Sequence, residues 1–122
     1  AASEQKKANG LTEAERKAAL QRAAEMLAEK TARFAKEMGV TYSRITIREQ
    51  KTRWGSCSSA GNLNYNWKLV LMPERVMDYV VIHELAHRKE MNHSTRFYAV
   101  VAQQMPDYKV WQSWLKEHGR EY

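Results

Sequence analysis

Two histidines four residues apart, with a glutamate directly after the first, form the most chemically specific pattern in the sequence, His83-Glu84-Leu85-Ala86-His87. On a helix, residues four apart lie on one face, so two imidazole nitrogens can bind one metal ion. Glu84 projects to the side of that metal, where its carboxylate can accept a proton from water without becoming a ligand. The pattern therefore predicts a metal-dependent hydrolytic site, with His83 and His87 as ligands and Glu84 as the general base.

Two residues compete for the position of a third ligand, which a catalytic zinc site normally has. His93 follows His87 by six residues, the interval of the extended zincin pattern His-Glu-x-x-His-x-x-Gly-x-x-His, and a left-handed turn at Asn92 would swing it back. Glu90 shares the helical face, but at about 1.5 Å of rise per residue it would lie about 10 Å along the axis from His83. Glu90 also stands where that pattern has glycine, so a true metzincin is not expected. We expect His83, His87 and His93 to hold one zinc ion per chain.

The remaining histidine and the single cysteine are weaker candidates. His118 is expected to be an ordinary residue of a C-terminal helix. Cys57, as the one cysteine, excludes an internal disulfide and a cysteine-rich structural zinc site. Its side chain has three possible roles: a small buried residue, a thiol that lines the cleft, or a latent zinc ligand that silences a proenzyme.

Length and composition limit what surrounds these residues. The sequence has 122 residues, of which 43% are hydrophobic, which suits a single domain over 1–122 with one modest core. No apolar run approaches the roughly 20 residues of a membrane span, and the N-terminus is polar, so we expect a cytoplasmic protein with no membrane partner. The formal net charge is +6. Because the Lys and Arg residues are spread along the chain, a solvated basic surface is favoured over a specific nucleic-acid site.

Helices are predicted from capping residues and apolar spacing. After a flexible lead-in over 1–10, Thr12 to Glu15 has the Thr-x-x-Glu form of a capping box. Proline suits the first position of a helix, and serine suits the residue before one. The predicted helices are an N-terminal packing helix from Thr12 to Gly39, the metal-binding helix from Pro73 to about Met91, one from Ser94 through Ala102, and a short last helix after Met105-Pro106-Asp107.

Three strands are predicted between the first two helices. Residues alternate in polarity from Tyr42 to Glu49 and, most regularly, from Leu63 to Leu71. A short extended segment from Arg53 to Ser58 lies between them, and Gly61-Asn62 suits a tight reversal after it. A small, mainly antiparallel three-stranded sheet is the expected result.

With these residues in view, the sequence resembles the YgjP-like metallopeptidase family, relatives of which have been called minimal gluzincins. The segments that carry the resemblance are Lys51 to Ser59, Gly61 to Trp67, Tyr79 to Phe97 and Met105 to Tyr108. It implies an α+β, zincin-like catalytic domain related to the SprT/Spartan and WLM proteases, which act on DNA-associated proteins. In that case His83, His87 and His93 would be the zinc ligands and Glu84 the catalytic glutamate. The word gluzincin implies a glutamate as third ligand in some relatives, whereas the segment around His93 favours histidine here.

We expect this site to hydrolyse peptide bonds, slowly or in a latent form, or only in unfolded or DNA-bound protein. One alternative is a metal-dependent nucleoside-triphosphate pyrophosphatase or phosphohydrolase, an activity also attached to the family. Its basic surface would suit nucleotide binding, but the sequence has no glycine-rich phosphate loop and no carboxylate cluster for magnesium. The other alternative is a DNA-associated binding module that keeps a zinc ion. The sequence does not indicate an oligomeric state.

The short extended segment before the predicted reversal at Gly61-Asn62 is expected to border the substrate groove. In zincins, which this chain resembles, the strand in that place forms the rim of the cleft, and an extended peptide pairs with its free edge. The resemblance therefore implies that Arg53 to Cys57 forms an edge strand beside the metal, with unpaired backbone groups that bind such a peptide. Gly55 and Ser56 are small enough to let a substrate backbone approach, Trp54 would anchor an apolar side chain, and Cys57 completes the groove. The alternative is that Trp54 belongs to the core and Gly55 is a bulge.

Overall fold

The computed structural model describes residues 7–50 and 53–122. Residues 1–6 of the expected lead-in, together with Lys51 and Thr52, lie outside the described residues. The rest of the lead-in is not entirely irregular, because Ala8–Gly10 form a short 3-10 helix, η1.

The long N-terminal helix, α1 (Glu13–Met38), begins and ends where the sequence predicts. The Thr12 hydroxyl accepts a hydrogen bond from the backbone N–H of Glu15 at 3.1 Å, and the Glu15 carboxylate accepts one from the N–H of Thr12 at 2.9 Å. These two bonds complete the predicted capping box. At the other end Gly39 has a φ of +71°, a left-handed conformation that glycine adopts without strain.

The three predicted strands form one sheet in the order β1-β3-β2. Their bounds are β1 Arg44–Arg48, β2 Gly55–Cys57 and β3 Asn62–Asn66. β2 and β3 form an antiparallel hairpin around Gly61, whose φ is +88°, but β1 pairs with β3 in parallel. The sheet is therefore mixed, which corrects the expectation of a mainly antiparallel one. The parallel register sets Ile45 beside Leu63, so the apolar side chains of both strands face the core.

β3 is shorter than its alternating sequence predicts, because Trp67–Leu71 form a 3-10 helix, η2. The side-chain oxygen of Asn66 accepts a hydrogen bond from the N–H of Lys68 at 3.0 Å and so caps η2. Trp67, Leu69, Val70 and Leu71 are buried. A fully buried apolar segment fits a strand and a helical turn equally well, so the pattern alone could not separate the two.

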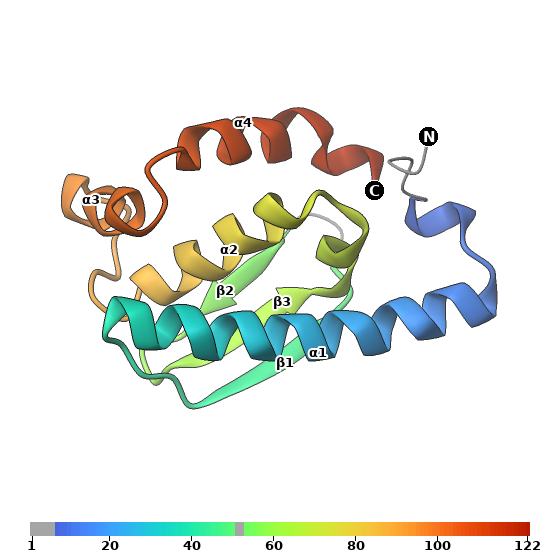
Figure 1. Ribbon diagram of the computed structural model, residues 1–122, viewed down its shortest axis with the longest axis horizontal. Coiled ribbons are helices and arrows are strands. Elements are labelled where there is room, and N and C mark those ends of the chain that lie inside the picture. Colours follow the sequence, from blue (N-terminus) through green and yellow to red (C-terminus); the bar gives the residue numbers. More distant parts are fainter. Residues whose placement is uncertain (1–6, 51–52) are drawn as a thin grey trace.

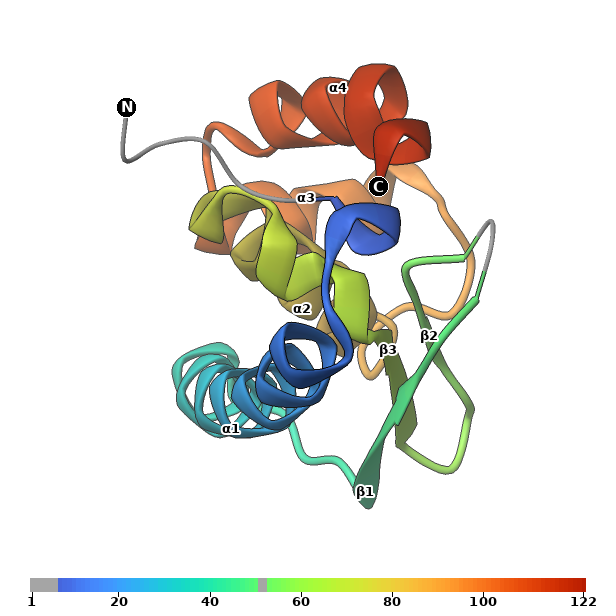
Figure 2. The same ribbon diagram turned by 90° about the vertical axis from the view of Figure 1, so that its right-hand side faces the viewer.

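The helix that carries the metal pattern, α2 (Glu74–Ala86), lies between α1 and α4 in both ribbon views and contacts β2 (Figures 1 and 2). It begins directly after Pro73 and is almost entirely buried. It ends at Ala86, short of the predicted Met91, because the N–H groups of the next residues bond to carbonyls three residues back and tighten the chain into a turn.

Two further helices complete the fold, α3 (Thr95–Gln104) and α4 (Tyr108–His118), and a 3-10 helix, η3 (Gly119–Glu121), follows α4. As predicted, Ser94 caps α3: its hydroxyl accepts a hydrogen bond from the N–H of Phe97 at 3.3 Å. The helices lie on one side of the sheet (Figure 2). No helix among the described residues is both long and apolar enough to cross a membrane.

Candidate metal centre

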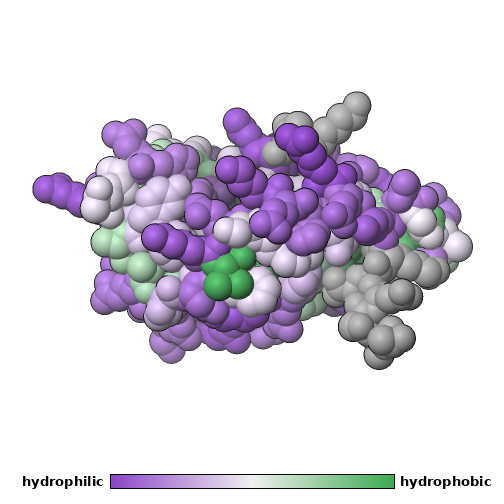
Figure 3. All heavy atoms as spheres, turned by 90° about the horizontal axis from the view of Figure 1, so that it is seen from above, coloured by the Kyte–Doolittle hydropathy of each residue, from purple (hydrophilic) through white to green (hydrophobic). Residues whose placement is uncertain are grey.

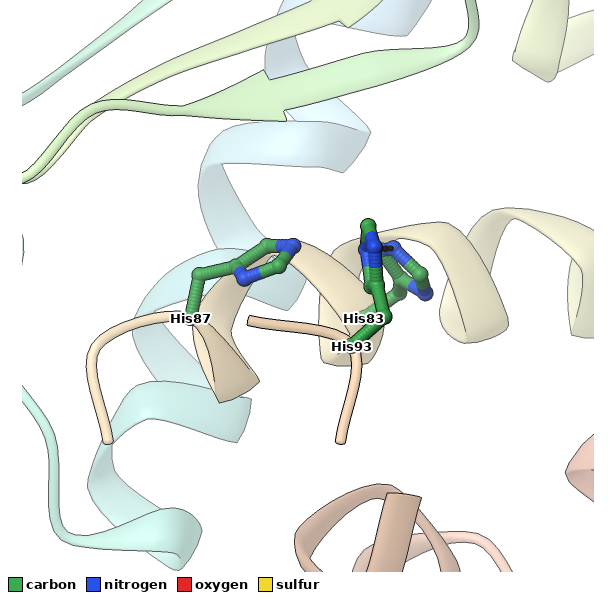
Figure 4. Close-up of side chains that lie close together, drawn as sticks. All are labelled: His83, His87 and His93. Atoms are coloured by element: carbon green, nitrogen blue, oxygen red, sulfur yellow. Dashed lines mark hydrogen bonds between the residues drawn. The ribbon is translucent and has the colours of Figure 1, made fainter. Parts of the chain in front are cut away.

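Three histidine side chains converge at the C-terminal end of α2 (Figure 4). His83 and His87 lie on and directly after the last turn of α2, and His93 lies in the loop before α3. One ring nitrogen from each histidine can be chosen so that all three lie within 4.8 Å of one another. The Nε2 atoms of His83 and His93 are 3.2 Å apart. The structure thus brings together the three residues that the sequence predicts as ligands.

A tight turn, different from the predicted one, returns His93 to the helix. The left-handed turn expected at Asn92 is wrong, because among the described residues only glycines have positive φ. Instead, the N–H of Ser94 donates to the carbonyl oxygen of Asn92 at 2.8 Å. A bond across three residues makes a γ-turn with His93 at its centre.

Glu90, the rival third ligand, contributes its backbone only. The metal-competent group found among the described residues contains the three histidines without Glu90. The Glu90 carbonyl oxygen lies 3.2 Å from Nδ1 of His87. Because a carbonyl only accepts, Nδ1 of His87 must carry the proton, which leaves Nε2 with the lone pair that a metal needs.

Phe97 supports all three histidine rings. Its ring centroid lies 4.9 Å from that of His83, 4.5 Å from that of His87 and 5.0 Å from that of His93. Phe97 is fully buried in the first turn of α3. Sequence reasoning missed this residue, because its only local sign is an aromatic residue three positions after the Ser94 cap.

Burial favours the uncharged form of His83 and His87. It lowers the pKa of His83 to about 4, and the neighbouring His87 and His93 lower it further. Burial also lowers the pKa of His87. A neutral imidazole is the form that binds a metal, and zinc commonly takes three such nitrogens in catalytic sites. The donor set of this centre therefore fits zinc.

Glu84 is buried beside this group, with 5% of its surface exposed. Burial raises the pKa of Glu84 to about 8, while the positive charge of Arg53 acts in the opposite direction. The carboxyl group lies against β2: a β-carbon built on Gly55 would be 3.0 Å from Cγ and 3.1 Å from Oε2 of Glu84. Any side chain at this position would require its neighbours to shift by a few tenths of an ångström, so glycine suits this close approach.

β2 is an edge strand on the side of the sheet next to α2, as predicted, but it covers only Gly55–Cys57, and Arg53 and Trp54 of the predicted strand lie outside it. The N–H of Asn66 donates to the carbonyl of Trp54 at 2.9 Å, and the N–H of Ser58 to that of Asn62 at 3.0 Å. In an antiparallel pair, alternate residues face the partner strand. The backbone groups of the intervening residues, Gly55 and Cys57, therefore point to the open edge.

The sequence profile described as the YgjP-like metallopeptidase domain matches residues 1–118. The chain belongs to the YgjP-like metallopeptidase family. Its fold is similar to that of the metallopeptidase zymogen of Pyrococcus abyssi abylysin, with a TM-score of 0.67 and 23% identity, covering 77% of this chain and 96% of the other. For the metallopeptidase zymogen of Methanocaldococcus jannaschii jannalysin the TM-score is 0.57 at 20% identity, covering 69% and 90% of the two chains. For Wss1 from Saccharomyces cerevisiae it is 0.58 at 14% identity, covering 80% and 79%. No curated protein sequence matches the chain.

In this YgjP-like domain, a cavity of about 210 Å³ opens beside Glu84. Its lining residues are Arg53, Trp54, Gly55, Tyr79, Val80, His83, Glu84 and Leu115. Trp54 lines the cavity and is partly buried against the core, and it packs against the end of α4, where a β-carbon on Gly119 would lie 3.0 Å from its ring.

The other sequence candidates lie at different distances from the chemistry. Ser56 bonds to the amide of Asn64 at 3.2 Å and does not line this cavity. Cys57 is half-buried, and burial, followed by the charge of Glu84, raises the pKa of its thiol. Neither Cys57 nor His118 belongs to the metal-competent group of the described residues. His118 instead contacts Glu121, with Nδ1 at 3.1 Å from a carboxylate oxygen.

Proposed function

We propose that this chain is a zinc-dependent peptidase in which His83, His87 and His93 hold the metal and Glu84 is the general base. The family supports the coarser statement that the domain is a metallopeptidase. The single observation that supports the specific roles of Glu84 and the three histidines is the position of the Glu84 carboxyl group. This buried carboxyl group lies against Gly55 of the edge strand β2, and Glu84 lines the same cavity as His83, one of the three histidines.

A zinc ion in this centre would supply Lewis-acid chemistry toward water and toward a peptide carbonyl. Glu84 handles the protons. In the metal-free protein, its raised pKa keeps the carboxyl group protonated near neutral pH. It would ionise beside a bound dication, because a nearby positive charge favours the carboxylate. Its carboxylate then accepts a proton from the attacking water and returns it to the leaving amine nitrogen.

An extended peptide would bind along β2. The outward N–H and C=O groups of Gly55 and Cys57 offer main-chain hydrogen bonds, which give affinity with little dependence on side chains. If the peptide runs antiparallel to β2, the residue that follows the scissile bond lies toward Trp54 and the cavity. The apolar walls from Trp54, Val80 and Leu115 would accept an apolar side chain.

This binding mode suits unfolded segments of protein, including those of proteins bound to DNA. An extended chain can reach a strand edge only where it is not already folded. Within the cavity, Arg53 is the only lysine or arginine among the lining residues. A nucleoside triphosphate carries several negative charges, so this lining favours a peptide over a nucleotide.

Parallel assays of casein cleavage, nucleoside-triphosphate hydrolysis and DNA binding test the proposal. Each is run with the zinc-loaded protein, with a chelator, and with the Glu84→Gln variant. Cleavage of casein over long incubation should require zinc and should be lost in Glu84→Gln. Nucleotide hydrolysis without casein cleavage would favour the phosphohydrolase. DNA binding without either hydrolysis, and with zinc still bound, would favour a binding module.

A further inference from the structure

Tyr79 lies one turn before His83 on α2. Its hydroxyl group contacts the imidazole ring of His83 on the side that faces away from the other two histidines. The Tyr79 hydroxyl oxygen is 3.4 Å from Nδ1 of His83, and the two rings meet edge to face with centroids 5.7 Å apart. Nε2 of His83 is the nitrogen that approaches His93, at 3.2 Å. Tyr79 therefore contacts the nitrogen that is not available to the metal.

A residue of α4 fixes the Tyr79 hydroxyl from the other side. Nε2 of Gln112 donates a hydrogen bond to the Tyr79 oxygen at 3.3 Å. When Nε2 of His83 is a ligand, Nδ1 carries the proton and donates to the same oxygen. Tyr79 is 5% exposed, and a buried hydroxyl group needs partners. For this hydroxyl the partners are Gln112 and the histidine.

Stacked rings join the same tyrosine to the third histidine. Tyr79 stacks on Tyr108 with centroids 6.5 Å apart, and Tyr108 stacks on Tyr98 at 5.8 Å. Tyr98 in turn stacks on His93 at 6.2 Å. His93 lies in a loop and is exposed, so packing from Tyr98 helps to hold its ring. Contacts from α4 therefore reach the first and the last of the three histidines.

We propose that Tyr79 is a positioning residue for the metal centre, held by Gln112, so that docking of α4 onto α2 sets the metal affinity of the three histidines. The inference rests on the proposed function only in taking these histidines as the ligands. Packing alone would not need the polar contacts, since α4 already presents apolar Trp114 and Leu115 to the core.

The outer surface seen from the α4 side is mostly hydrophilic, with small separate apolar patches (Figure 3).

The test is the zinc dissociation constant, measured by competition with a chromogenic chelator. Tyr79→Phe removes the hydroxyl and keeps the stacked ring, so its zinc affinity should fall about 10- to 100-fold, the usual effect of losing a partner of a metal-bound histidine. Gln112→Leu should weaken zinc binding in the same direction but less. The double variant should bind zinc no more weakly than Tyr79→Phe, because both changes remove parts of one chain of contacts.

Tyr108→Phe is the matched control. It removes a hydroxyl from the neighbouring ring and leaves the stack in place, so zinc affinity should not change. Zinc binding by Tyr79→Phe and Gln112→Leu within twofold of the unchanged protein, or an equal loss in Tyr108→Phe, would overturn the inference. Failure of the proposed function looks different: His83→Ala would then bind zinc as well as the unchanged protein. Thermal unfolding of each metal-free variant identifies any variant that does not fold, and Gln112→Leu remains informative if Tyr79→Phe is one of these.

Discussion

Gly55 and Glu84 are in direct contact across the space between β2 and α2. A β-carbon on Gly55 would lie 3.0 Å from Cγ of Glu84, closer than side chains normally approach. The absence of a methyl group at Gly55 therefore lets the carboxyl group lie close to the strand that would bind substrate.

Gly55→Ala should consequently damage hydrolysis more than metal binding. The added methyl displaces the Glu84 carboxyl group, and small misplacements of a catalytic group cost about 10- to 100-fold in rate. The measurements are casein cleavage and zinc content. Gly10→Ala is the matched control, because a β-carbon at Gly10 would meet nothing within 4 Å. Full activity in Gly55→Ala would show that the contact with Glu84 has no role in catalysis.

Substitutions of Glu84 and of the helical histidines should separate chemistry from metal binding. Glu84→Gln removes a base and no ligand, so it should keep one zinc per chain and lose hydrolysis. His83→Ala or His87→Ala should lose the metal, with lower thermal stability in zinc-containing buffer, because metal binding stabilises the folded state. Metal analysis of the purified variants decides between the two roles. Zinc loss with retained activity in Glu84→Gln would reverse the assignment.

The local parts of this site were predictable from sequence. Helical spacing alone sets His83 and His87 on one face, and the capping residues Thr12 and Ser94 mark helix starts with their own side chains. The hairpin of β2 and β3 followed from a short extended segment and a tight turn at Gly61. Such features depend on a few neighbouring residues.

The remaining parts depend on contacts between distant segments. The parallel pairing of β1 with β3 depends on the path of the chain between the two strands. The residues of the strands themselves do not indicate this direction. Phe97 under the histidines and Gln112 beside Tyr79 look like ordinary helix residues until the helices pack together. The contact between Gly55 and Glu84 likewise joins residues 29 positions apart.

Removal of each candidate third ligand should give opposite results. His93→Ala takes one imidazole from the group, so zinc affinity should fall by at least about 100-fold, as expected when one ligand of three is lost. Glu90→Ala should keep zinc, because Glu90 contacts His87 through its backbone carbonyl, which the substitution leaves in place. Chelator competition measures both. Zinc loss in Glu90→Ala combined with normal binding in His93→Ala would make Glu90 the ligand.

The buried carboxyl group of Glu84 predicts how the stability of the metal-free protein depends on pH. Burial raises its pKa to about 8, compared with 4.5 for an ordinary glutamate. Between these values the unfolded chain has released this proton while the folded chain keeps it, so rising pH favours unfolding. For one proton, the free energy of unfolding falls by at most about 1.4 kcal/mol per pH unit.

Glu84→Gln isolates this effect, because it has no proton to release at this position and keeps the same histidines. The free energy of unfolding of the metal-free protein, minus that of metal-free Glu84→Gln, should decline from about pH 4.5 to about pH 8 and then level off. The lowered pKa of His83 makes both proteins less stable as pH falls below its ordinary value of 6.5, and this contribution cancels in the difference. Urea denaturation of both proteins at a series of pH values, with a chelator present, measures this difference in the free energy of unfolding. A difference that rises with pH would mean that the folded protein stabilises the carboxylate even without metal, and Glu84 would then be a base before any metal binds.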